Sequence, residues 1–407
     1  MSEGQRLMSN GEPSDDTNTS TLAFKRQMSL KDISIPSKSA ILHTIKQTSF
    51  FLLPTFVQTT IRPSDQPPKP LHPTAWLDGM RGIAAFLVFI FHISYATHDV
   101  ATAYAPDGGK TDLLRLPIVR FLYHGPAMQM WHWGSSFLGF ANPFTGKRMY
   151  LDGHLWTIPL EFRASIILYA TQLGVCRLRT RYRVGSLLCL MAWAHYIDNW
   201  VVLLFYAGFL LAELDIRRTA LAASTTFSTT LAPPKPNLLW TILYTLTFIG
   251  GLYLGGQPEQ HWEHAPGWMT LWSLIPPYIH DRHRYWTGWG ALLLVWSTSN
   301  SGILQRIFTN AFTQYLGKIS FSLYLVHGFV IHTAYYAFIE VLWGVIGDET
   351  DMQKEVSFAV ALVVVTGVLV WVSDVFTRAV DVPSVKFARW VEGRMIAKPR
   401  TVKEEPA

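Results

Sequence analysis

Three ionisable side chains interrupt a segment that is otherwise apolar enough to span a membrane. The stretch "WLDGMRGIAAFLVFIFH", residues 76–92, contains Asp78, Arg81 and His92. Arg81 and His92 are eleven residues apart, and eleven steps of 100° make three turns plus 20°, so both project from one helix face, roughly 16 Å apart along its axis. Ionisable residues within a span are costly and by default face a cavity or a partner. This helix is therefore predicted to carry a functional site.

The three residues suit different roles. Asp78 lies one turn before Arg81 and can pair with it near the cytosolic boundary; the alternative is a snorkelling pair that only marks that boundary. His92 lies about one turn from the outer end of the span, where burial favours the neutral imidazole that a general base or a nucleophile requires. The alternative for His92 is a histidine satisfied by helix packing.

A second cluster is "GHLWTIPLEFRAS", residues 153–165. Counted from the outer end, Glu161 lies roughly 9 Å into its helix, at a depth similar to that of His92. Glu161 and Arg163 point about 200° apart, so they cannot serve one site side by side. We expect Glu161 to line the cavity and Arg163 to pair with a neighbouring helix.

A third cluster is "YLGKISFSLYLVHGFVIH", residues 315–332. Ser320, Tyr324 and His327 stand at spacings of four and three and form one polar stripe on a helix. The stripe is either part of a site or a set of interhelical hydrogen bonds, each worth about 0.6 kcal/mol in a bilayer.

Composition indicates the elements that position these clusters. Of 407 residues, 49% are hydrophobic and 15% charged, whereas soluble domains carry about 25% charged residues. We predict an all-α, polytopic membrane helix bundle of about eight transmembrane helices. The apolar runs lie near residues 77–97, 155–175, 185–198, 200–214, 238–256, 286–302, 319–343 and 357–378. Within the fifth run, the spacing of Gly251 and Gly255 is suited to close helix approach.

The basic residues indicate the orientation. With both termini in the cytosol, cytosolic segments hold 24 Lys and Arg residues and outer segments hold 8. Because the basic residues lie in short loops between apolar runs, we expect no nucleic-acid binding. Cys176 and Cys189 form no disulfide framework or zinc cluster, and the turn at His195, Asp198 and Asn199 has too few converging ligands for a metal.

Four regions are predicted along the chain. Residues 1–40 are polar and rich in Ser and Thr, which indicates a disordered cytosolic tail without the apolar core of a signal peptide. Residues 41–75 are predicted to form an interfacial helix broken by Pro54, followed by a Pro-rich linker. The transmembrane domain occupies residues 76–380, and residues 381–407 form a basic cytosolic tail. The endoplasmic reticulum is the default membrane for such a chain.

Four motifs together resemble the acyltransferase 3 family, most closely its fungal members. They are "LDGMRGIAAFLVFIFH", "HLWTIPLEFRAS", "AGFLLAELD" and "LGKISFSLYLVHG", and they lie in order between about residues 75 and 380. The first helix of the family carries an arginine, ten residues and a histidine, which match Arg81 and His92. The resemblance implies an enzyme that acylates hydroxyls of small molecules from a cytosolic acyl-CoA, with the histidine essential.

One block of the family pattern is missing. Members carry a "FFVISGY"-like helix, a loop with paired arginines and another helix after the first span, whereas here "FLYHGPAMQ" runs directly into "MWHWGSSFLGFANPF". The chain is thus predicted to lack the usual second and third transmembrane helices. The missing arginines are associated with acyl-CoA handling; the basic loop Arg177 to Arg183 could replace them or could act only as a topology signal.

The sequence therefore predicts a bilayer-embedded O-acyltransferase. It would use acyl-CoA, specifically acetyl-CoA, as co-substrate with no tightly bound cofactor or metal, and acylate a small hydroxylated fungal secondary metabolite. His92 would be the catalytic base and Glu161 would orient it. Arg81, paired with Asp78, would meet the phosphates or pantetheine arm of coenzyme A. Two alternatives are a small-molecule transporter or exporter lined by the intramembrane ionisable residues, and a catalytically impaired, shortened family member.

Overall fold

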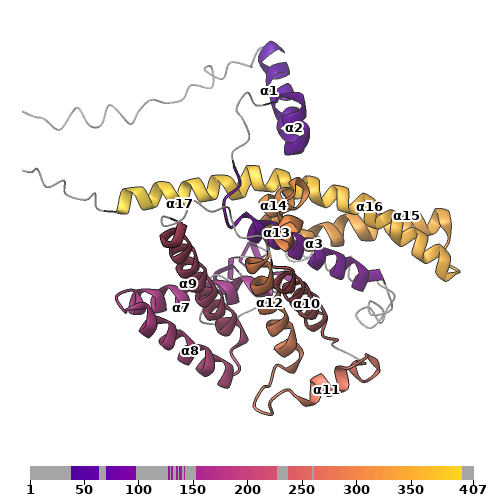
Figure 1. Ribbon diagram of the computed structural model, residues 1–407. Coiled ribbons are helices and arrows are strands. Elements are labelled where there is room, and N and C mark those ends of the chain that lie inside the picture. Colours follow the sequence, from indigo (N-terminus) through magenta and orange to yellow (C-terminus); the bar gives the residue numbers. More distant parts are fainter. Residues whose placement is uncertain are drawn as a thin grey trace, which may run out of the picture. The chain divides into compact units, whose positions relative to one another are not determined.

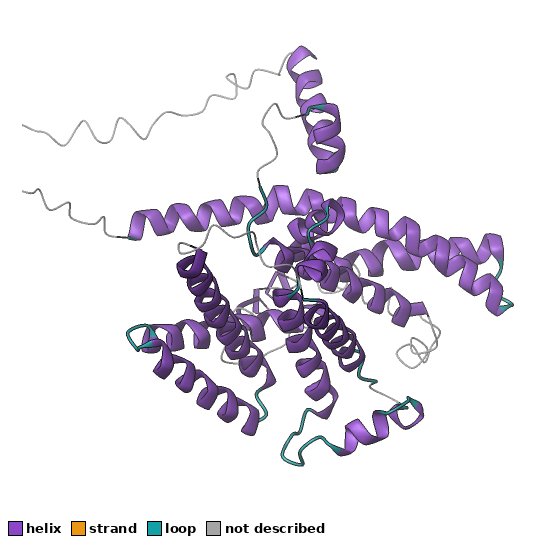
Figure 2. Ribbon diagram, viewed as in Figure 1, coloured by secondary structure: helices purple, strands orange, loops and turns teal. Residues whose placement is uncertain are grey.

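A computed structural model describes residues 38–63, 70–97, 153–226, 237–258 and 261–396, with separate positions between 127 and 142. Over these residues it contains helices and loops and no strand (Figure 2). Contacts divide the chain into two units, Met1–Arg62 and Pro63–Ala407. Much of the predicted N-terminal tail, the Pro-rich linker and the segment expected to lack two helices lie outside the described residues.

The first unit contains two short helices that meet at a proline. Helix α1 spans Lys38–Leu52 and α2 spans Thr55–Ile61, with Pro54 as the residue that precedes α2. Proline has no N–H to donate and cannot continue α1. The side chain of Gln58 donates hydrogen bonds to the carbonyls of Phe50 and Leu53, at 2.8 Å each. The helical break predicted at Pro54 is present.

The second unit is a set of helices labelled in Figure 1. All eight predicted spans coincide with helical segments. The longer helices are α3 (Ala75–Thr97), α7 (Thr157–Val175), α8 (Thr180–Tyr196), α9 (Trp200–Thr226), α10 (Leu238–Gly255), α12 (Arg282–Asn300), α14 (Ala311–Val330) and α16 (Asp351–Phe376). The shorter ones are η2 (Gly153–Trp156), η3 (Trp262–His264), α11 (Trp268–Ser273), α13 (Gly302–Phe308), η4 (Ile331–Tyr335), α15 (Tyr336–Ile346), η5 (Thr377–Asp381) and α17 (Val382–Met395).

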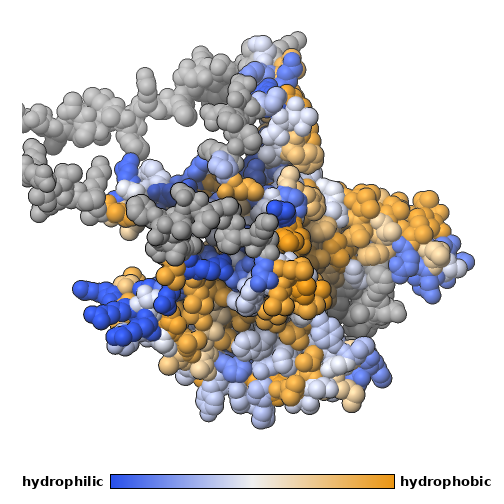
Figure 3. All heavy atoms as spheres, in the orientation of Figure 1, coloured by the Kyte–Doolittle hydropathy of each residue, from blue (hydrophilic) through white to orange (hydrophobic). Residues whose placement is uncertain are grey.

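Among the residues that the structure describes, four helical segments are long and apolar enough to cross a membrane. They are Ala75–Ser94, Leu238–Gly255, Ala311–Ile346 and Asp351–Met395, the last two being 36 and 45 residues long. The last segment is longer than its predicted run because the π-helical turn η5 joins α16 to α17 without a break. The run predicted at 319–343 already passes through the π-helical turn η4, and the observed segment exceeds it mainly because α14 begins at Ala311. Large apolar side chains such as Val345 and Val363, which are 80% and 73% exposed, cover α15 and α16 (Figure 3). Such surfaces fit a lipid environment, so the chain is a helical membrane protein.

Helix α14 lies at the centre of the larger core. It starts where the Asn310 side chain accepts a hydrogen bond from the Thr313 N–H, at 3.0 Å, which satisfies one of the N–H groups left open at a helix start. Ile319 and Leu323 of α14 pack with Phe89 of α3 and Leu369 of α16, all four with no exposed surface. The sequence predicts that α14 carries candidate site residues. Its packing against α3 and α16 explains how it can hold those residues rigidly.

Glycines let two helix pairs approach closely. A Cβ at Gly82 of α3 would lie 2.5 Å from the carbonyl carbon of Leu316, and a Cβ at Gly317 would lie 2.7 Å from that of Asp78. On the other pair, a Cβ at Gly290 would lie 2.7 Å from the Gly251 carbonyl oxygen. The close approach predicted for the α10 glycines is therefore confirmed, with α12 as the partner.

Candidate active site

Arg81 joins α3 to α14. Its Nε donates to Ser320 Oγ at 2.9 Å and its Nη2 donates to the Gly317 carbonyl at 3.2 Å. Nη2 also lies 3.3 Å from Asp78 Oδ1. The predicted Asp78–Arg81 pair is present, but both side chains are about 60% exposed (62% and 59%), so the pair itself contributes little to stability. Ser320 of the predicted stripe has an interhelical role here.

His92 and His327 form a stacked pair between the same two helices. Their ring centroids are 5.3 Å apart and the ring planes are inclined by 24°. His327 has no exposed surface, whereas His92 is partly exposed. Because Arg81 and His92 both meet α14, the prediction that they share one face of α3 is confirmed. The pairing itself could not be read from the spacing, which says nothing about which helices are neighbours.

Hydrogen bonding fixes the proton on His327. Its Nδ1 lies 2.7 Å from the carbonyl oxygen of Tyr324. A carbonyl oxygen only accepts, so Nδ1 carries the hydrogen and Nε2 of the neutral ring carries the lone pair. Two protonated rings at 5.3 Å would repel each other by about 3 kcal/mol at an effective dielectric constant of 20. The pair therefore favours a state in which at least one imidazole is neutral and basic.

Helix α7 meets the stripe through Thr157. The hydroxyl oxygens of Thr157 and Tyr324 are 2.7 Å apart, and Thr157 also forms a side-chain hydrogen bond with Glu161. A threonine hydroxyl has one hydrogen, so when it donates to the Glu161 carboxylate its oxygen accepts from the Tyr324 hydroxyl. The order Tyr324 to Thr157 to Glu161 connects the carboxylate to the residue whose carbonyl fixes His327. Two hydroxyls thus link Glu161 to Tyr324, whose ring lies 5.5 Å from that of His327, centroid to centroid.

Arg163 lies elsewhere, as its spacing from Glu161 predicts. It lines a small pocket with Asn199 and Val202 at the start of α9. Glu161 and Arg163 of α7 therefore lie in different surroundings.

Two features of the site were missed from the sequence. Thr157 stands one turn before Glu161 in "TIPLE", and that spacing was the available signal. The second is an ion pair between Arg378 Nη2 and Asp374 Oδ2, at 2.8 Å, in which the Asp374 side chain is 1% exposed. Beside it, Thr377 donates to Ser322 of α14 at 2.7 Å. The sequence places Arg378 at the start of the cytosolic region. In the structure Arg378 pairs with Asp374, next to the Thr377–Ser322 hydrogen bond that connects η5 to α14.

Within the residues that the structure describes, no group of three His, Cys, Asp or Glu side chains could hold a metal ion. The site described above consists of imidazole, hydroxyl, carboxyl and guanidinium groups.

Comparisons with known proteins define the class as a membrane acyltransferase. The family model Acyl_transf_3, described as an acyltransferase domain, matches residues 113–378. The chain belongs to this acyltransferase 3 family. The matched segment contains α7 and α14, while α3 with Arg81 and His92 precedes it.

Three curated fungal relatives are similar to the chain. O-acetyltransferase PaAT-1 of Phomopsis amygdali is 29% identical over 60% of this chain and 50% of its own length. Acyltransferase R4 of a Phoma species is 26% identical over 57% and 50%, and acyltransferase clz18 of Cochliobolus lunatus is 25% identical over 56% and 49%. The matches thus span about half the length of these relatives. No solved structure matches the chain.

Proposed function

We propose that this protein transfers an acetyl group from acetyl-CoA to a hydroxyl of a small molecule in fungal secondary metabolism. In this proposal it crosses the endoplasmic reticulum membrane about eight times, with both termini in the cytosol. The observation that carries the proposal is the His92–His327 ring pair, 5.3 Å between centroids, held between α3 and α14. The similarity to the O-acetyltransferase of Phomopsis amygdali supports the acetyl group.

The pair supplies the base that O-acylation needs. His92 takes the hydroxyl proton of the acceptor while the hydroxyl oxygen attacks the thioester carbonyl. The carbon–sulfur bond then breaks, and the departing thiolate of coenzyme A takes up that proton. His92 is the reacting member because it is partly exposed, and the buried His327 supports its ring from behind.

The other residues position the reactants. Glu161, through Thr157 and Tyr324, holds α7 and α14 in register so that the imidazole pair keeps its orientation. Arg81, with its side chain 62% exposed, keeps surface for a phosphate or the pantetheine arm while Ser320 and the Asp78 carboxylate fix its direction. Its distance of roughly 16 Å from His92 matches an extended pantetheine arm in scale.

Purified membranes incubated with radiolabelled acetyl-CoA and a panel of alcohols test the proposal. Wild-type protein and His332→Ala should transfer label, whereas His92→Ala should lose transfer. His332 is a matched control because it lies on the same continuous helix as His327 and its ring also contacts a tyrosine, 5.7 Å from Tyr336. Uptake of the alcohol without any label transfer would instead favour a transporter and overturn the proposal.

A further inference from the structure

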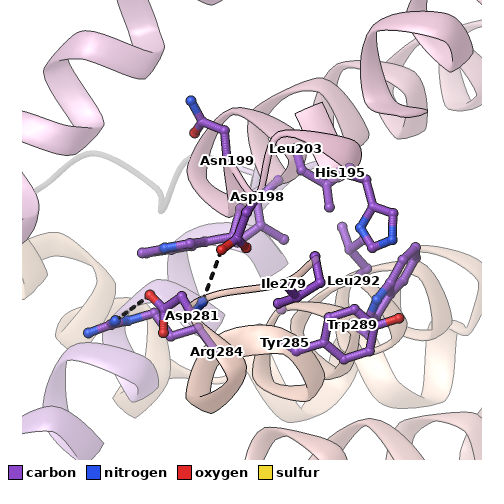
Figure 4. Close-up of a pocket in the computed structure, with 13 residues that line it drawn as sticks. His195, Asp198, Asn199, Leu203, Ile279, Asp281, Arg284, Tyr285, Trp289 and Leu292 are labelled. Carbon is purple, nitrogen blue, oxygen red and sulfur yellow. Dashed lines mark hydrogen bonds and ion pairs between the residues drawn. The ribbon is translucent and has the colours of Figure 1, made fainter. Parts of the chain in front are cut away.

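A pocket lies where α8 ends and α9 and α12 begin (Figure 4). Its lining includes His195, Asp198, Asp281, Arg284, Tyr285 and Trp289, all of them partly exposed, so the pocket is accessible. It encloses about 30 Å³, which is space for a hydroxyl group but not for a whole ring compound. Only the hydroxyl-bearing edge of a ligand would enter it, and the rest of the molecule would lie over the mouth.

The charged groups of the pocket are already satisfied by the protein. Asp198 Oδ2 accepts hydrogen bonds from the backbone N–H groups of His280 and Asp281, at 2.7 and 2.9 Å. The Asp281 carboxylate pairs with Arg284 at 2.6 Å. Two carboxylates beside one guanidinium disfavour a polyanion such as coenzyme A. The pocket is therefore suited to something other than the acyl donor.

A cationic ligand is disfavoured as well. The Arg284 guanidinium carbon lies 4.7 Å from the ring centroid of Trp156 and 5.4 Å from that of Trp200. A second cation stacked on these rings would meet the guanidinium charge. The ligand that fits this wall carries no charge.

The remaining wall is aromatic and can form hydrogen bonds. The His195 ring lies 5.9 Å from Tyr285 and 6.1 Å from Trp289, centroid to centroid. The Tyr285 hydroxyl can donate a hydrogen bond to a ligand. Flat aromatic faces beside a hydroxyl and an imidazole recognise the ring and the hydroxyl of a neutral ring alcohol.

Two adjacent residues link this pocket to the histidine pair. Trp156 contacts Arg284 of the pocket, and Thr157 forms the hydrogen bond to Tyr324 beside His327. The end of η2 and the start of α7 therefore contact both the pocket and the candidate active site. A molecule anchored in the pocket lies next to the element that borders the reacting groups.

We propose that this pocket binds the acceptor of the acyl-transfer reaction and that the acceptor is a neutral, hydroxyl-bearing ring compound. That the ligand is the acceptor of acyl transfer rests on the proposed function. The class of ligand rests on the pocket alone. Tritiated menthol, a neutral ring alcohol, is the probe. Its binding to the full chain in lipid nanodiscs is measured by equilibrium dialysis, with empty nanodiscs as the blank.

Filling the pocket gives the sharpest test. Gly288 lines the pocket, and a Cβ added there would meet its nearest neighbour, a Leu204 methyl, at 3.9 Å. The methyl group of Gly288→Ala should therefore occupy the cavity without displacing backbone and weaken menthol binding at least about tenfold. Gly208→Ala is the matched control, because Gly208 lies in α9 with nothing within 4 Å of such a Cβ. It should bind menthol like the wild type.

Removing an aromatic wall provides a second, independent variant. Trp289→Leu should weaken binding about tenfold, whereas Trp240→Leu, which changes a 52% exposed tryptophan on α10, should not. Excess unlabelled menthol should displace the probe and excess acetyl-CoA should not. The inference is overturned if the wild type shows no saturable binding, if both pocket variants bind normally, or if acetyl-CoA competes. Saturable binding without label transfer to any alcohol would refute the proposed function and leave the ligand class standing.

Discussion

A methyl group at Gly82 would test how closely α3 and α14 must approach for the histidine pair to work. Its Cβ would lie 2.5 Å from the carbonyl carbon of Leu316, against ordinary contacts of 3.4–4 Å. The opposing atoms belong to the backbone, so the helices must separate by about 1 Å. Overpacking of this kind costs about 1–3 kcal/mol of stability. A displacement of about 1 Å at a reacting group can lower the rate about 100-fold.

The assay compares Gly82→Ala with Gly367→Ala. Gly367 lies in α16 with nothing within 4 Å of an added Cβ, so alanine there should keep activity and raise helix stability by about 0.5–1 kcal/mol. Because Gly82 adjoins Arg81, whose contacts with Ser320 and Gly317 would also be disturbed, we expect Gly82→Ala to raise the acetyl-CoA KM as well as to lower kcat about 100-fold. Thermal unfolding in detergent reports the stability of both. Wild-type kcat and an unchanged unfolding midpoint in Gly82→Ala would refute the close packing on which the site depends.

Three further results follow from the contacts. Thr157→Val and Thr171→Val each remove a threonine–tyrosine hydrogen bond of α7, at 2.7 and 3.0 Å respectively. Each variant should lower the free energy of unfolding by about 1 kcal/mol, measured by thermal unfolding. Only Thr157→Val should lower kcat, by about tenfold. Equal kcat in both would exclude a positioning role. Arg81→Lys keeps the charge and loses the guanidinium fork, so the KM for acetyl-CoA should rise about tenfold in initial-rate measurements; an unchanged KM contradicts the donor assignment. Asp374→Asn removes the carboxylate charge beside Arg378 in a site where the two side chains are 1% and 17% exposed, and should cost about 3 kcal/mol in thermal unfolding. Adding Arg378→Met should recover part of this loss, and additive losses would count against a coupled pair.

The helical organisation could be predicted because each run of apolar residues carries its own signal. All eight predicted spans are helical, and the break at Pro54 is present because proline affects only its own neighbourhood. The length of the last helical segment was underestimated. There the chain continues from α16 into α17 through the π-helical turn η5, whose extra residue per turn leaves no mark in hydropathy.

The site could be predicted only as far as single helices determine it. Spacing correctly gave a shared face to Arg81 and His92 and separate surroundings to Glu161 and Arg163. Spacing could not show that this face of α3 contacts His327 of α14. Which helices are neighbours depends on packing between segments that are distant in the sequence. The ion pair between Asp374 and Arg378 did have a sequence signal, because the two residues are four positions apart on one helix. Only the neighbouring contact between Thr377 and Ser322 of α14 depends on packing between distant segments.

The contact between Arg81 and Ser320 joins residues 239 positions apart. At about 5–20 residues per second, a ribosome needs about 10–50 s to make the intervening chain. During that time α3 resides in the bilayer with an arginine and a histidine that lack their final neighbours, at a cost of a few kcal/mol for the arginine. Biogenesis of this protein thus includes an interval in which its earliest core helix depends on the insertion machinery or on transient neighbours. Premature termination before α14 would leave that helix without its partner, and the nascent chain would become a substrate for membrane quality control.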